Sequence, residues 1–178
     1  RVTPEQTRMG LTEGDHKARL VAMDIKSKRL VDPDKCYAPV PGIVGFRFLL
    51  GTCDPNVDVI STTDFVTAYL QADGWPEDKW ILVCFMDPET GEIKYYWLTG
   101  PVYGGQESGC DWGITRTDRI CREMGFRQSE NIPSVYYHPE RDIKVPIHVD
   151  DPCVFAKRVE DSKWFHSEIS KIFETKGE

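Results

Sequence analysis

Short apolar runs bounded by polar or turn-forming residues recur along the chain, and they predict strands that bury at least one face. The clearest pair lies at residues 79–86 and 92–98, on either side of the turn sequence D-P-E-T-G. A second pair lies at residues 143–149 and 153–156, with Val145, Ile147 and Val149 alternating in the first run. Both pairs predict β-hairpins. Further strands are expected at residues 19–25, 57–63 and 134–137.

Helical spacing of apolar residues appears in fewer segments. Residues 43–53 and 111–124 are expected helices, the second ending at Gly125. A last helix is expected from the capping pair Asp161 and Ser162 to a stop at Gly177. A short helical turn is expected at residues 67–72. Strands outnumber helices and are joined by short hairpins, so the fold class is α+β, an antiparallel sheet with helices packed on one face.

Three carboxylates close two of the expected strands. Asp64 follows the β-branched run 57–63, and the pair Asp150 and Asp151 follows the run 143–149 at or near a hairpin tip. Adjacent carboxylates repel each other unless water or a cation relieves the repulsion, and oxygen ligands suit Mg²⁺ or Mn²⁺. A solvated acidic turn is the alternative, because Asp is common in turns. If the two strands are neighbours, the three carboxylates could hold two ions about 3.5–4 Å apart.

Composition sets the broad class. The 178 residues are 40% hydrophobic and 29% charged, which indicates a globular domain rather than a disordered chain. The net charge of −7 lacks the basic footprint of a typical nucleic-acid binder, although basic residues concentrate before residue 30. The apolar run 81–86 is too short to cross a bilayer, so we expect no membrane association. With no initial Met and no visible signal peptide, the chain is expected to be an intracellular piece of a longer protein.

Other chemistries find little support. The six cysteines form no C-x-x-C pair and no zinc-finger spacing with histidine, so we expect reduced thiols rather than disulfides or a zinc site. The glycine-rich segment 104–109 lacks the ending of a phosphate-binding P-loop. No nucleophile elbow surrounds a serine, and the four histidines form no H-E-x-x-H motif.

An ordered set of short motifs then identifies a resemblance. The chain reads K-A-R-L-V-A at 17–22, Y-A-P-V at 37–40, T-D-F-V-T-A-Y-L at 63–70, V-Y-G at 102–104, G-F-R-Q-S at 125–129 and H-V-D-D at 148–151, with Trp112 between. In this order and spacing they resemble the reverse transcriptase domain of copia-type long-terminal-repeat retrotransposons. The resemblance covers about residues 17–177.

This resemblance implies a right-hand polymerase of which the chain covers fingers and palm, with the thumb and ribonuclease H domain absent. Residues 1–56 would be mainly fingers, and residues 57–178 mainly palm with interleaved fingers segments. The implied activity is RNA-directed DNA polymerase, the two-metal transfer of deoxynucleotides from dNTPs onto a primer 3′ end. Asp64 and Asp150 would be the main ligands of two Mg²⁺ (or Mn²⁺) ions, and Asp151 a third.

The resemblance also implies substrate contacts and partners. Tyr69 would lie under the incoming sugar and exclude a 2′-hydroxyl, Arg19 would reach the triphosphate from the fingers, and Gln106 would belong to the nucleotide-binding loop. Partners would be an RNA or DNA template with its primer, dNTP, and the rest of a Pol polyprotein with its thumb, ribonuclease H and integrase. The expected location is a cytoplasmic particle, the nucleus or both.

Several positions depart from the family pattern. His148 replaces the tyrosine of Y-V-D-D, Pro146 interrupts an expected central strand, and Pro152 follows the acidic pair. Glu107 and Cys110 fall where the family's loop has glutamine and arginine, and a glutamate beside a triphosphate would repel it. A catalytically degenerate remnant, acting as a structural or interaction module, is therefore the alternative. An unrelated two-metal nuclease is a third reading.

Overall fold

The computed structural model describes residues 10–12, 15–17, 21–24, 30–87 and 89–177. The chain divides into two compact units that interleave along the sequence. Unit 1 comprises residues 1–37 and 72–112, and unit 2 comprises residues 38–71 and 113–178.

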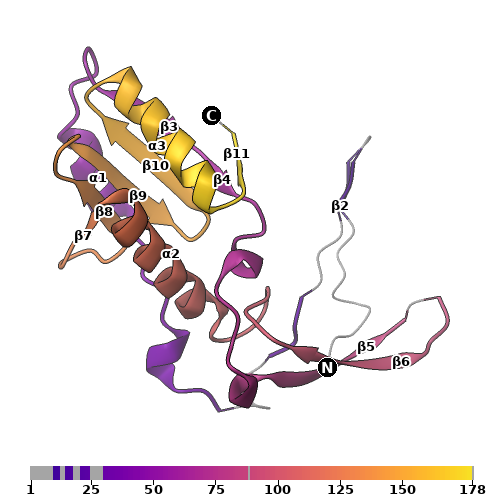
Figure 1. Ribbon diagram of the computed structural model, residues 1–178. Helices are drawn as coiled ribbons and strands as arrows, with labels where there is room; N and C mark the ends of the chain where they lie inside the picture. Colours follow the sequence, from indigo (N-terminus) through magenta and orange to yellow (C-terminus); the bar gives the residue numbers. More distant parts are fainter. Residues whose placement is uncertain (1–9, 13–14, 18–20, 25–29, 88, 178) are drawn as a thin grey trace. The chain divides into compact units, whose positions relative to one another are not determined.

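Unit 2 is built on a five-stranded sheet in the order β3-β10-β9-β8-β7, in which every neighbouring pair is antiparallel. Its strands are β3 (Val59–Thr62), β7 (Arg127–Gln128), β8 (Val135–His138), β9 (Ile143–His148) and β10 (Asp151–Ala156). Beyond β3 the chain continues as β4 (Asp64–Phe65), which pairs with β11 (Thr175–Lys176). The expected strands at 57–63, 134–137 and 143–156 are thus confirmed, and Figure 1 shows the sheet with its helices.

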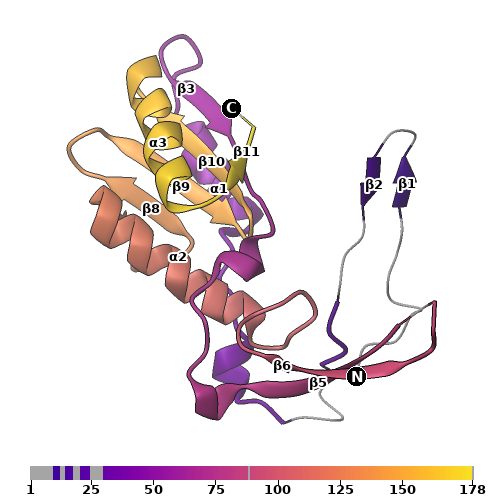
Figure 2. The same cartoon turned by 45° about the vertical axis from the view of Figure 1, so that its right-hand side comes forward.

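Helices lie on both faces of this sheet (Figures 1 and 2). On one face α1 (Gly42–Gly51) packs through Leu49 and Phe46 against Phe155 of β10, with the Phe46 and Phe155 ring centroids 5.8 Å apart. On the other face lie α2 (Ser108–Met124) and α3 (Val159–Ile172). The expectation of helices on one face therefore holds for α2 and α3 and is wrong for α1. Gly45 permits α1 to approach closely, because a Cβ there would lie 3.1 Å from the Ile132 side chain.

The buried face of α2 follows a four-residue spacing. Trp112, Arg116, Ile120 and Met124 recur every four residues and are all buried. That spacing places the four side chains on one face of a helix, and this face packs against the sheet.

The last helix differs from its expected limits. It begins at Val159 and ends at Ile172, so Asp161 and Ser162 lie inside its first turn and Gly177 lies beyond β11. Asp161 is buried and accepts hydrogen bonds from Arg158 (2.6 Å) and Arg141 (2.9 Å). These bonds lower the pKa of Asp161. Asp161 therefore ties the helix to neighbouring loops instead of capping it.

Unit 1 contains the other expected hairpin, β5 (Ile81–Met86) paired with β6 (Ile93–Leu98) in a regular antiparallel register. Its remaining elements are β1 (Gly10–Thr12), β2 (Asp15–Lys17), η2 (Pro33–Cys36) and η4 (Glu77–Lys79). The expected strand at 19–25 lies partly outside the described residues, and its described part, 21–24, is not in a strand. Instead the Ala22 amide donates to the Tyr103 carbonyl at 2.8 Å.

All six cysteines are free thiols. Within the described ranges, no helix combines the length and apolar character needed to cross a bilayer.

Candidate active site

The backbone of β3 and β10 brings the predicted carboxylates together. The register pairs Thr62 with Cys153, and it continues through two further bonds: the Thr63 amide donates to the Pro152 carbonyl (3.3 Å), and the Phe65 amide donates to the Asp150 carbonyl (2.9 Å). In that register Asp64 lies directly opposite Asp151. Because side chains alternate across a strand, both lie on the sheet face that carries Phe155 and α1.

Asp150 occupies the tip of the β9–β10 hairpin. The register pairs His148 with Asp151, which leaves a two-residue turn of Val149 and Asp150. Val149 has φ +56°, and Asp150 has no positive φ, the sign pattern of a type II′ turn. A β-branched residue is costly in this region of backbone conformation. The turn that presents the acidic pair is therefore strained.

Like charges at this edge influence one another. The pKa of Asp151 is raised above its usual range, first by burial and then by the negative charges of Asp150 and Asp64, while His148 acts in the opposite direction. Asp150 and Asp64 are thus both within electrostatic reach of Asp151. Among the residues that the structure describes, however, no three His, Cys, Asp or Glu side chains are gathered as a ready-made metal site. The donor set suits Mg²⁺, but its side chains do not converge on one point.

Tyr69 lies at the same edge. It belongs to the 3₁₀ turn η3 (Ala68–Gln71), which follows Thr67 at φ +49°. The pKa of Tyr69 is raised by burial and by the charge of Asp150, and lowered by the charge of Arg116. The turn itself is fixed by Gln71, whose Oε1 accepts from the Glu174 amide at 2.6 Å. Tyr69 is therefore within electrostatic reach of Asp150.

The other two predicted substrate residues are Gln106 and Arg19. Gln106 lies in unit 1, where its backbone N–H and its side-chain Nε2 both donate to the Asp24 carboxylate, at 3.1 and 3.0 Å. Glu107 lines a cavity of about 260 Å³ in the same unit, together with Lys35 and Lys79. Arg19 lies outside the described residues.

Arg116 is a residue of this edge that the motif comparison does not indicate. It projects from α2, is 2% exposed, and its Nη1 donates to the Val149 carbonyl at 2.6 Å. The available signal was its position: a charge four residues after Trp112 and four before Ile120, in the middle of an apolar stripe.

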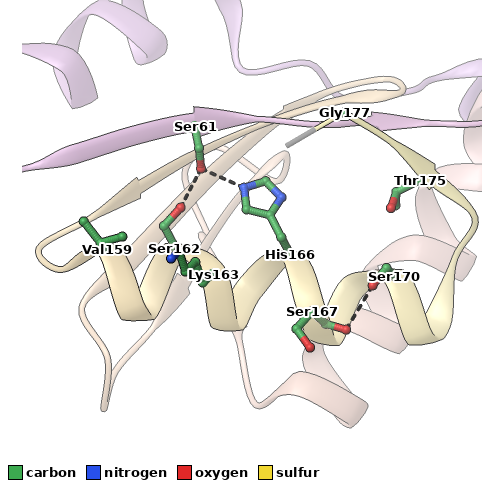
Figure 3. Close-up of a pocket in the computed structure, with 9 residues that line it drawn as sticks. All are labelled: Ser61, Val159, Ser162, Lys163, His166, Ser167, Ser170, Thr175 and Gly177. Atoms are coloured by element: carbon green, nitrogen blue, oxygen red, sulfur yellow. Dashed lines mark hydrogen bonds between the residues drawn. The ribbon is translucent and has the colours of Figure 1, made fainter.

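A cavity of about 660 Å³ lies on the opposite face, between β3, α3 and β11 (Figure 3). There Ser61 Oγ lies 2.7 Å from Ser162 Oγ and 2.8 Å from His166 Nε2. Ser61 neighbours Thr62 and therefore points away from the face of Asp64. None of the described residues that line this cavity carries a carboxylate, so they do not offer the ligands that a divalent ion prefers. Its hydrogen bonds attach α3 to the edge strand.

Comparison with known proteins supplies the family. A family described as reverse transcriptase (RNA-dependent DNA polymerase) matches residues 5–177. No curated protein and no solved structure gives a match. The family match spans nearly the whole chain, and its range includes both acidic segments. The chain therefore belongs to the reverse transcriptase (RNA-dependent DNA polymerase) family.

Proposed function

We propose that this chain is the fingers and palm part of a copia-type reverse transcriptase, which adds deoxynucleotides to a primer 3′ end on an RNA or DNA template. One observation carries the proposal: the β3–β10 register sets Asp64 opposite Asp151, with Asp150 at the adjoining hairpin tip. Two strands far apart in the sequence thus deliver the acidic residues of the family's motifs to one edge.

In this proposal Asp64 and Asp150 hold two Mg²⁺ or Mn²⁺ ions, with Asp151 as the third carboxylate. Such ions, when bound, activate the primer hydroxyl and neutralise the charge that develops on the transferred phosphate. The raised pKa of Asp151 supports a site built for a cation, because the negative charges of Asp150 and Asp64 that contribute to it would be relieved by a positive ion. The side chains must turn toward a common point to bind one.

The chain's own residues supply position and selectivity. Tyr69 stands beside Asp150, where its ring meets the sugar of an incoming nucleotide and excludes a 2′-hydroxyl. Residues 1–56 would be mainly fingers and residues 57–178 mainly palm with interleaved fingers segments, and Arg19 and Gln106 would contact the triphosphate. The protein would work inside the cell, in a cytoplasmic particle or the nucleus, beside the thumb, ribonuclease H and integrase parts of a Pol polyprotein.

A second candidate function, a non-catalytic module, is favoured by one specific observation. Gln106 is engaged by Asp24 through both its backbone and its side chain, so it is held within unit 1 and not presented to a nucleotide. A remnant that kept its fold would retain such internal contacts without needing catalysis.

Primer extension decides between them. In a form of the protein long enough to extend a primer, Asp64→Asn and Asp150→Asn should each reduce Mg²⁺-dependent extension by about a thousandfold, equivalent to about 4 kcal/mol in the barrier. Circular dichroism should show an unchanged fold. The matched control is Asp58→Asn, which alters a carboxylate at the far end of β3 and should leave extension unchanged. Absence of extension by the unaltered protein would favour the non-catalytic module.

A further inference from the structure

The buried charge of Arg116 requires an explanation. A charged side chain inside a protein is costly unless it is paired or hydrogen-bonded. Arg116 lies on the buried stripe of α2 and is only 2% exposed. It donates to the carbonyl oxygen of Val149 at 2.6 Å, a short charge-assisted bond to the turn that carries Asp150.

That turn has two costs of its own. Val149 adopts φ +56° although it is β-branched, and such backbone strain persists only where surrounding structure holds it. The turn also presents Asp150 next to Asp151, and Asp64 lies opposite Asp151 on the adjacent segment of the chain. Like charges opposite one another in a sheet are destabilising. A donor with a positive charge placed behind the turn offsets both costs.

The reach of the charge is visible at Tyr69. The negative charge of Asp150 raises the pKa of this phenol and the positive charge of Arg116 lowers it, so both charges act on the same ring. Three elements of unit 2 thereby converge: η3 with Tyr69, the β9–β10 turn with Asp150, and α2 with Arg116.

We infer that Arg116 is a positioning residue: its guanidinium fixes the Val149 carbonyl, and its charge lets the acidic turn keep its shape before any metal ion binds. The significance of this for catalysis rests on the proposed polymerase function. The contact and the charge balance can be tested without polymerisation.

The test is a double-mutant cycle measured by chemical denaturation in metal-free buffer. Arg116→Met should raise the unfolding equilibrium constant. The factor by which it does so should be about five times smaller in an Asp150→Asn background. Arg122→Met is the matched control, because Arg122 lies on the same helix, has a 78% exposed side chain and pairs with Asp118 at 2.6 Å. Its effect should be the same in both backgrounds. An effect of Arg116→Met that agrees within about twofold in the two backgrounds overturns the inference. If Arg116→Met does not fold, Arg116→Gln takes its place in the cycle.

A second measurement separates position from charge. Arg116→Lys keeps the positive charge but loses the planar donor, so a change in Mn²⁺ affinity reports the position of the turn alone. We expect Mn²⁺ to bind about tenfold more weakly, as for other residues that orient metal ligands, with Arg122→Lys unchanged. Equal Mn²⁺ affinity of Arg116→Lys and the unaltered chain would contradict the inference. If the unaltered chain binds no Mn²⁺, the proposed function fails, and the denaturation cycle still decides the role of Arg116.

Discussion

The two ends of the β3–β10 ladder differ in the charges that face each other on the paired strands. At one end Asp58 faces Lys157, with Nζ 2.8 Å from Oδ2, and this bond lowers the pKa of Asp58 and raises that of Lys157. At the other end, in the same register and on the same face, Asp64 faces Asp151. Opposite charges across a sheet stabilise and like charges destabilise. The ladder therefore carries a hydrogen-bonded ion pair at one end and two like charges at the other, which is the end to which the proposed function assigns a cation.

The largest expected effect is on the choice between ribonucleotides and deoxynucleotides at the acidic end. Tyr69→Val removes the ring beside Asp150, so the ratio of ribonucleotide to deoxynucleotide incorporation should rise by about a hundredfold, the usual penalty for an added hydroxyl in an apolar pocket. Single-nucleotide primer extension with paired rNTP and dNTP measures the ratio. Tyr137→Val, on β8, is the control. A ratio unchanged by Tyr69→Val would return that ring to a purely structural role.

Metal binding should distinguish the ends next. Mn²⁺ at ten times its dissociation constant should stabilise the unaltered chain by about 1.4 kcal/mol, seen as a rise in melting temperature. Asp64→Asn should abolish most of this rise, whereas Asp58→Asn should keep it. The same loss in both variants would mean that the ion binds without preference for the acidic end.

Reversing one charge should make the acidic end resemble the other. Without metal, Asp151→Lys places a cation opposite Asp64 and should raise the free energy of unfolding by about 0.5–1 kcal/mol. Lys157→Asp makes the converse change and should lower it. Urea denaturation of both variants gives the comparison, and a destabilising Asp151→Lys would show that Asp64 and Asp151 do not repel each other.

The smallest expected effect is a difference in pH dependence. Ionised Asp58 has a lowered pKa, so its contribution to stability is present at neutral pH and is lost as the pH falls through that pKa. Asp151 has a raised pKa, so its protonation contributes stability at low pH that is lost as the pH rises through that pKa. Between about pH 3 and 6, around the ordinary Asp value, Asp151→Asn should make acid destabilisation steeper, and Asp58→Asn should make it shallower. Denaturation curves across this range measure both slopes.

Sequence reasoning located the acidic edge because its information is local. Asp64 ends a β-branched run, and Asp150 and Asp151 end another, so both positions follow from strand periodicity and from the family motifs. The register that sets Asp64 opposite Asp151, and Asp58 opposite Lys157, depends on pairing between distant strands. No pattern within either strand specifies that pairing.

The residues that sequence reasoning missed depend on contacts between distant segments. Arg116 could have been noticed as a charge within an apolar stripe, but its partner, the Val149 carbonyl, carries no sequence signal because every residue has one. The bonds from Gln106 to Asp24 join positions 82 residues apart, so a motif that assigns Gln106 to a nucleotide cannot reveal them. Packing of α1 on the second face of the sheet was missed because α1 is apolar around much of its circumference, which leaves its buried side undefined.

The prolines near the acidic turn have a consequence for amide hydrogen exchange. Pro146 and Pro152 have no amide proton, and in the β9–β10 register the paired residues are Asp151 with His148, Pro152 with Ile147, and Phe155 with Lys144. The amides of Thr63 and Phe65 donate to the carbonyls of Pro152 and Asp150, and these two bonds join the acidic turn to the neighbouring segment. These two amide protons exchange with solvent when the acidic edge opens. Their exchange rates thus report the motion of the carboxylates, which have no exchangeable proton of their own when ionised.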